Sequence, residues 1–249
     1  MIVVLSGEGP TDFGTSATGV EHSLFADILF GPLAEMIDRL AEPHIGYSLR
    51  DCRMYRLISE AGLSARAKGL KARKKQSLTL SGKKKAKETA YFHTNARALA
   101  DIAKEVAVEV GCDAVAILFR DSDGTASAGR GEWVEKRDSM LNGFALENFQ
   151  LGVPMLAKPK SEAWLLCALR PNAYQNCDSL EDESGNDNSP NSLKDQLEAI
   201  LGEPANRELL RQLVADGRID PLQIEMPSFT DFKNRLRNVL PGHTSATSQ

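Results

Sequence analysis

Several features that would assign this 249-residue chain to a membrane or secreted class are missing. No apolar run approaches the roughly 20 residues that a membrane span requires. The N-terminal run from Met1 to Leu5 is short and lacks the basic lead of a signal peptide. We therefore expect a cytoplasmic protein with no membrane partner.

Cysteine and histidine are also scarce, with four of each in the chain. The cysteines form no Cys-x-x-Cys pair, which argues against both a zinc knuckle and a disulfide framework. The histidines show no His-Glu-x-x-His spacing. We expect reduced thiols in a reducing cytoplasm. The four cysteines are Cys52, Cys112, Cys167 and Cys177.

Phosphate-binding glycine motifs are absent as well. Gly7, Gly9 and Gly14 do not fit the Gly-x-Gly-x-x-Gly spacing, and no Gly-Lys-Ser/Thr follows them. A nucleotide-binding module is therefore disfavoured.

Charge is unevenly distributed although the net charge is only -4. The segment from Arg66 to Lys87 holds ten basic residues and no acidic one, whereas the rest of the chain has 20 basic and 34 acidic residues. This pattern indicates a cationic arm on an acidic body. The arm is either a solvated loop or a contact for nucleic-acid phosphates, which lysines engage without reading sequence. Its candidate nucleic-acid-binding residues are Lys71, Arg73, Lys74, Lys75, Lys83, Lys84 and Lys85.

Hydrophobic patterning predicts strands that alternate with helices. This alternation is typical of an α/β fold whose mostly parallel sheet has helices on both faces. We expect a domain over residues 1–175 with a basic insertion at 62–88, followed by a small helical C-terminal extension at 190–240. The expected strands are 2–5, 52–58, 114–119 and 152–157, and the expected helices are 21–40, 90–110, 132–149, 160–169 and 228–240.

Acidic residues follow two of the predicted strands. Glu8 comes after the first strand, and Asp121 and Asp123 come after the strand that ends at Phe119. In extended backbone the two aspartates point to the same side. They repel each other unless a cation lies between them, and Mg²⁺ prefers such oxygen ligands. The alternative to a metal site is an ordinary turn after each strand, with Asp12 as a helix cap.

The order of these motifs resembles the Toprim superfamily, which includes topoisomerases, primases and the OLD-type (overcoming lysogenization defect) nucleases. The resemblance rests on Glu8-Gly9 and on the later Asp121-x-Asp123 pair, and it covers roughly residues 1–170. The segment 159–166 is similar to a block of small standalone Toprim-like proteins, several of which accompany anti-phage defence systems. The segment 227–232 resembles their final helix more weakly.

The resemblance implies a Toprim-like fold and a nuclease that cleaves DNA or RNA with Mg²⁺ or Mn²⁺. Glu8 would be the general acid/base or a metal ligand, and Lys160 or Lys158 would stabilise charge on the phosphate. The implied partners are nucleic acid and an ATPase or other defence-system protein, and homo-oligomer formation stays open. The implied metal ligands are Glu8, Asp121, Asp123 and Glu162.

Two other functions stay open. The segment from Phe119 to Thr125 also resembles the first motif of haloacid-dehalogenase-type phosphatases, in which Asp121 would be the nucleophile. That motif normally opens its domain, whereas here a strand, a helix and an acidic turn precede it. The other alternative is a non-catalytic nucleic-acid-binding subunit with a vestigial metal site.

Overall fold

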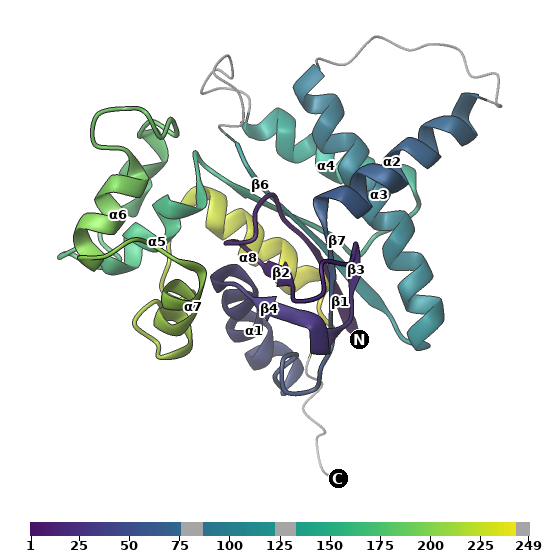
Figure 1. The fold of residues 1–249 in the computed structure, drawn as a ribbon, viewed down its shortest axis with the longest axis horizontal. Coiled ribbons are helices and arrows are strands. Elements are labelled where there is room, and N and C mark those ends of the chain that lie inside the picture. The colour runs from purple at the N-terminus through teal and green to yellow at the C-terminus, as the bar shows by residue number, and fades with distance from the viewer. Residues whose placement is uncertain (76–86, 123–132, 243–249) are drawn as a thin grey trace.

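A five-stranded sheet forms the centre of the protein, in the order β3-β5-β1-β6-β7 (Figure 1). The computed structural model describes residues 1–75, 87–122 and 133–242. The last four strands in this order are parallel, and β3 pairs antiparallel with β5. The predicted α/β class with a mostly parallel sheet is therefore confirmed. The strands are β1 (Ile2–Ser6), β3 (His22–Ser23), β5 (Tyr55–Ile58), β6 (Ala114–Asp121) and β7 (Gly152–Ala157).

Helices cover both faces of this sheet, so the central strands β1 and β6 are apolar up to their polar carboxyl ends. On one face, α1 (Pro32–Ile45), α5 (Ser161–Leu169) and α8 (Pro227–Val239) share a core with Val3, Leu5 and Phe119. On the other face, α2 (Glu60–Lys75), α3 (Lys87–Val110) and α4 (Trp133–Leu146) pack on Val4 and Leu118. Successive strand residues thus serve opposite faces.

The C-terminal helices pack against the same body (Figure 1). Before α8 come α6 (Leu193–Leu201) and α7 (Arg207–Ala215). In α8, the ring of Phe229 lies 4.9 Å from that of Trp164 in α5, centroid to centroid. Residues 190–240 thus contain the helices α6, α7 and α8. No helix within the described parts of the chain combines the length and hydropathy needed to cross a membrane.

The helix expected at residues 21–40 is wrong over its first half. That segment contains β3, the 3-10 helix η1 (Phe25–Asp27) and β4 (Ile28–Phe30), and β4 pairs antiparallel with β2 (Gly14–Ser16). The leucines that gave the helical spacing do not form a buried stripe, because Leu24 and Leu29 are 51% and 45% exposed. The helix begins at Pro32, after an extended Gly31.

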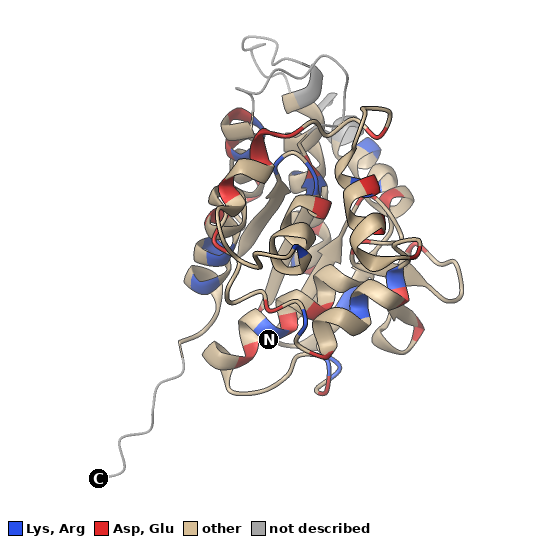
Figure 2. Cartoon of the chain, turned by 90° about the vertical axis from the view of Figure 1, so that its left-hand side faces the viewer, with Lys and Arg blue, Asp and Glu red and all other residues tan. Residues whose placement is uncertain are grey.

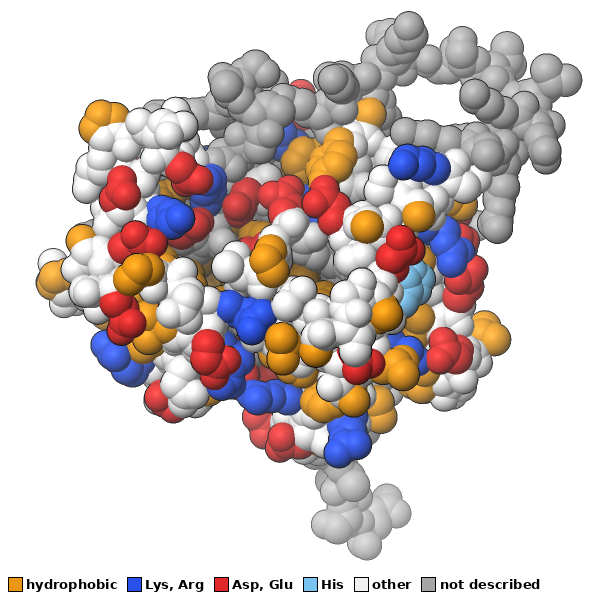
Figure 3. Space-filling model, viewed as in Figure 1, with side chains coloured by type: hydrophobic (Ala, Val, Ile, Leu, Met, Phe, Trp, Pro, Cys, Tyr) orange, Lys and Arg blue, Asp and Glu red, His pale blue; other side chains and the backbone are white. Residues whose placement is uncertain are grey.

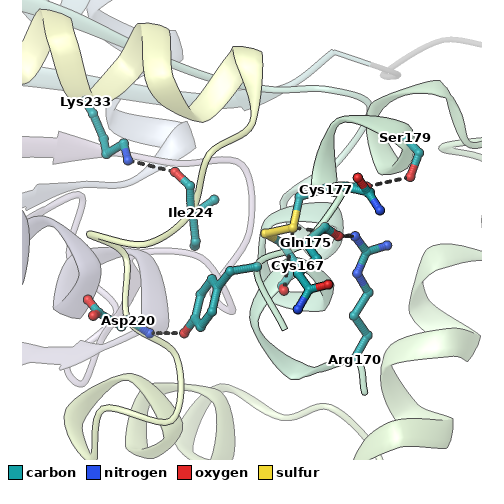
Figure 4. The surroundings of a disulfide bond; sticks show 10 residues. Cys167, Arg170, Gln175, Cys177, Ser179, Asp220, Ile224 and Lys233 are labelled. Atoms are coloured by element: carbon teal, nitrogen blue, oxygen red, sulfur yellow. Dashed lines mark hydrogen bonds between the residues drawn. A yellow bond between two sulfur atoms is a disulfide. The ribbon is translucent and has the colours of Figure 1, made fainter. Parts of the chain in front are cut away.

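The expectation of reduced thiols without a disulfide is also wrong. Cys167 in α5 is bonded to Cys177 at the start of the 3-10 helix η2 (Cys177–Asp182), with 5.2 Å between their Cα atoms (Figure 4). The chain reverses after α5, where the Tyr174 N–H donates to the Cys167 carbonyl at 2.7 Å. This reversal joins two cysteines that their sequence spacing did not pair. Cys52 and Cys112 are free.

Loss of this disulfide should destabilise the protein. The disulfide removes conformational entropy from the unfolded chain, which raises the free energy of the unfolded state by about 3 kcal/mol for a loop of this length. Cys167→Ser should therefore lower the melting temperature by about 5–10 °C. Calorimetry without reductant measures this change, and Cys52→Ser is the matched control. An unchanged melting temperature, or mass spectrometry that finds both thiols alkylated in the native protein, would contradict the pairing.

Candidate functional site

The carboxyl ends of β1 and β6 define the place where a site is expected in this fold. From β1 the chain continues to α1 on one face of the sheet, and α4, which follows β6, packs on the other face. In open parallel sheets, ligands bind in the crevice between two such strands. The register pairs Ser6 with Leu118, so Glu8 and Asp121 follow at the same edge. Figure 2 shows how the acidic and basic residues are distributed over the described chain.

Glu8 lies in a tight loop directly after β1. The carboxylate of Asp12 accepts a hydrogen bond from the Gly9 N–H at 2.8 Å, which closes the loop. The side chain of Glu8 is 34% exposed, and its Oε1 lies 3.6 Å from the Nε of Arg120. Glu8 is therefore accessible to a ligand while a cation stands beside it.

Asp121 is the last residue of β6 and lies over the start of α5. Its Oδ1 accepts the N–H of Ser161 at 3.0 Å, so the helix N-terminus orients the carboxylate. The Ser122 N–H donates to the carbonyls of Ala157 and Pro159 at 3.1 and 3.0 Å, which ties the end of β6 to the loop after β7. Asp123 lies outside the described residues, so the expected Asp121/Asp123 pair stays a prediction.

Glu162 faces a cavity beside this loop. The cavity has a volume of about 170 Å³, and Asp12 and Glu162 both line it. Oε2 of Glu162 is buried and has no hydrogen-bond partner among the residues that the structure describes. A buried carboxylate oxygen without a donor is costly, which makes it a ready ligand for a cation.

Asp12 is the residue of the site that the sequence did not identify. It caps no helix, because α1 begins only at Pro32. Burial raises the pKa of Asp12 from 3.8 to about 7; the Gly9 hydrogen bond and Arg120 oppose this rise, while the charges of Glu8 and Glu162 add to it. The negative charges of Glu8 and Glu162 therefore both act on the carboxyl group of Asp12. The available signal was its position four residues after Glu8 in the same loop.

Both candidate lysines form ion pairs. The partners of Lys158 lie in η2, and Lys160 pairs with a residue in the segment after η2. Nζ of Lys160 lies 2.8 Å from a carboxylate oxygen of Asp187, which lines the same cavity as Asp12. Nζ of Lys158 lies 3.8 Å from Glu181 and 3.9 Å from Asp182. Lys160 is thus at the rim of the cavity, whereas Lys158 is directed to η2.

These carboxylates are suited to a hard divalent cation, since all the donors are oxygen atoms. Within residues 1–75, 87–122 and 133–242, however, no three Asp, Glu, His or Cys residues are close enough to complete a metal site. The described residues thus provide a partial ligand set, in which Oε2 of Glu162 has no hydrogen-bond partner among them and burial, with the charges of Glu8 and Glu162, raises the pKa of Asp12. Figure 3 shows acidic side chains in a row across the upper part of one face.

The basic arm begins on α2, which projects beside α3 (Figure 1). Arg66 belongs to the folded body, because it donates to Asp101 at 2.8 Å and to Glu105 at 2.5 Å. The backbone of α2 continues to Lys75, and the side chains from Lys71 onward are not described. Lys83, Lys84 and Lys85 lie outside the described residues, so the nucleic-acid contact of the arm stays a prediction.

No protein-family model, curated protein or solved structure matches the chain. What the site can do is therefore argued from its own residues.

Asp12 should give the protein a characteristic pH dependence in the presence of a chelator. Because its pKa is raised to about 7 in the native state, the native protein retains a proton that the unfolded chain loses above about pH 4. Its contribution to stability is full below pH 4 and declines as the pH rises to 7. The neutral variant Asp12→Asn keeps an acceptor for the Gly9 N–H. We expect its melting temperature to exceed that of the wild type by a margin that grows from pH 4 to 7 and then levels off.

Thermal melts at pH 4, 5, 6, 7 and 8 measure this margin, with the exposed Asp51→Asn as the control. A margin that is the same at every pH would contradict the assignment.

Proposed function

We propose that the protein is a Mg²⁺- or Mn²⁺-dependent nuclease of the Toprim type that hydrolyses phosphodiester bonds in DNA or RNA. The observation that carries this proposal is the buried carboxylate of Asp12, which lines one cavity with Glu162 and lies within reach of the charge of Glu8. Clustered carboxylate oxygens of this kind are ligands that a divalent cation prefers.

The chemistry of the donors supports a divalent cation. Four carboxylates lie around the loop after β1 and the start of α5, and Arg120 is a buried cation beside Glu8. The carboxylates are those of Glu8, Asp12, Asp121 and Glu162.

The chain's residues have distinct roles in this proposal. A bound metal ion would activate a water molecule and neutralise charge that develops on the phosphate. Asp121, held by the Ser161 N–H, presents its carboxylate from the sheet edge, and Glu162 presents its unpartnered oxygen from α5. Asp12 can exchange a proton near neutral pH, as a general acid or base requires. Lys160 is placed at the rim, where phosphate would approach.

The wider biology follows from the resemblance to Toprim-like defence proteins. We propose nucleic acid as the substrate and the basic arm as its electrostatic contact. An ATPase or another defence-system protein is the proposed partner of such an effector.

Removal of either strand-end carboxylate should abolish cleavage while preserving the fold. We expect Glu8→Gln and Asp121→Asn to reduce Mn²⁺-dependent cleavage of plasmid, single-stranded DNA and tRNA by at least about 100-fold, because each removes a ligand for the metal ion that stabilises the transition state. Gel assays measure the rates. Glu109→Gln, an exposed acid at the far end of α3, is the control.

The result that overturns the proposal is a wild-type protein without metal-dependent cleavage. Phosphate release from small phosphomonoesters, with an aspartyl-phosphate at Asp121, would instead establish the dehalogenase-type chemistry. Salt-sensitive binding without cleavage by any metal would establish a binding subunit.

The basic arm should control the salt dependence of nucleic-acid binding. Each lost phosphate contact reduces the slope of log K against log salt concentration by about 0.9 on duplex DNA. Neutralising Lys71, Arg73, Lys74 and Lys75 together should therefore lower the magnitude of this slope by about 3.6 if each contacts one phosphate. Fluorescence anisotropy at several salt concentrations measures it, and Arg66→Gln is the control because Arg66 is already paired. An unchanged slope would show that these four side chains contact no phosphate and that the arm is a solvated segment.

A further inference from the structure

Arg120 is a cation buried at the edge of the candidate site. Its side chain is 0% exposed, and arginine is almost never fully buried unless it is paired. Nη1 donates to the carbonyl of Phe119 at 2.6 Å, and the guanidinium lies 5.5 Å from the centre of the Tyr91 ring. Nε and Nη2 have no hydrogen-bond acceptor among the described residues. The Phe119 carbonyl therefore fixes the guanidinium through Nη1, whereas Nε and Nη2 donate to no acceptor within the described residues.

Its counter-ion is Glu8. Nε lies 3.6 Å from Oε1 of Glu8, a longer separation than the roughly 2.7–2.9 Å of a charge-assisted hydrogen bond. The two groups therefore attract each other by charge without a hydrogen bond. Arg120 also lowers the pKa of Asp12, so its charge acts on the carboxylates of this loop.

Strand geometry keeps Arg120 away from the other half of the site. Residues 118 and 119 of β6 pack on opposite faces, so Arg120 lies on the α3 face with Leu118, and Asp121 lies on the α5 face. Arg120 is consequently closest to Glu8, whereas Asp121 lies on the other face of the sheet.

We propose that Arg120 is a positioning residue that holds Glu8 before the metal ion binds and competes with that ion for the Glu8 carboxylate. This inference rests on the proposed metal-dependent function. Two effects of opposite sign follow. The fixed positive charge competes with the metal ion for the Glu8 carboxylate and so weakens metal binding. The same charge holds the Glu8 carboxylate in place, which favours the reaction once metal is bound.

The test is to remove the charge of Arg120 and measure metal binding separately from cleavage. In calorimetric titrations with Mn²⁺, Arg120→Gln should bind the ion about tenfold more tightly than the wild type. At saturating Mn²⁺ its rate of DNA cleavage should be at least tenfold lower. Arg56→Gln is the matched control, since Arg56 is another strand arginine paired with a glutamate, 2.7 Å away. It should change neither quantity.

The double variant with Glu8→Gln tests whether the effect acts through Glu8. We expect Arg120→Gln to leave Mn²⁺ affinity within twofold in that background. An equally large gain there, or a folded Arg120→Gln protein whose Mn²⁺ affinity is unchanged or reduced, would overturn the inference while leaving the metal site itself intact. A wild-type protein that binds no Mn²⁺ would overturn the proposed function and this inference together.

Arg120→Lys keeps the test decisive if Arg120→Gln does not fold, as judged by circular dichroism. Lysine retains the buried charge but cannot reproduce the planar guanidinium. We expect Mn²⁺ affinity within twofold of the wild type and a cleavage rate about tenfold lower at saturating metal. A wild-type cleavage rate in this variant would overturn the positioning role.

Discussion

The parallel pairing of β1 with β6 is the constraint on which the candidate site depends. Their register sets Ser6 opposite Leu118 and thereby brings two loops far apart in sequence to one edge of the sheet. The chain leaves these two strands toward opposite faces, so no helix of the described structure covers the ends of both. A shift of one residue in this pairing would turn the Asp121 side chain away from α5.

Strand alternation then divides the charges at this edge. Asp121 is held on the α5 face by the N–H of Ser161, and Arg120 is buried on the α3 face beside Glu8. On the α5 side, burial and the charges of Glu8 and Glu162 raise the pKa of Asp12, and Oε2 of Glu162 has no hydrogen-bond partner within the described residues. The proposed metal ion would add positive charge beside these carboxylates, and Arg120 would limit how tightly it binds.

The sequence predicted the strand ends well, because long apolar runs stop at polar residues where the buried sheet stops. It did not predict the features that depend on contacts between residues far apart in the sequence. Leu24 and Leu29 have helical spacing, but Leu24 precedes the 3-10 helix η1 and Leu29 lies in strand β4, and both are exposed. The bonded cysteines meet through a chain reversal that their spacing does not reveal. Asp12 and Arg120 become notable only through burial and charged neighbours, which no motif records.

A crystal structure of the protein soaked with Mn²⁺ tests the central claim most directly. The anomalous map should show an ion bound directly to carboxylate oxygens of both Glu8 and Asp121, with Glu8 turned away from the Nε of Arg120. An ion bound elsewhere, or an empty edge in which Glu8 still faces Arg120 at saturating Mn²⁺, would contradict the account.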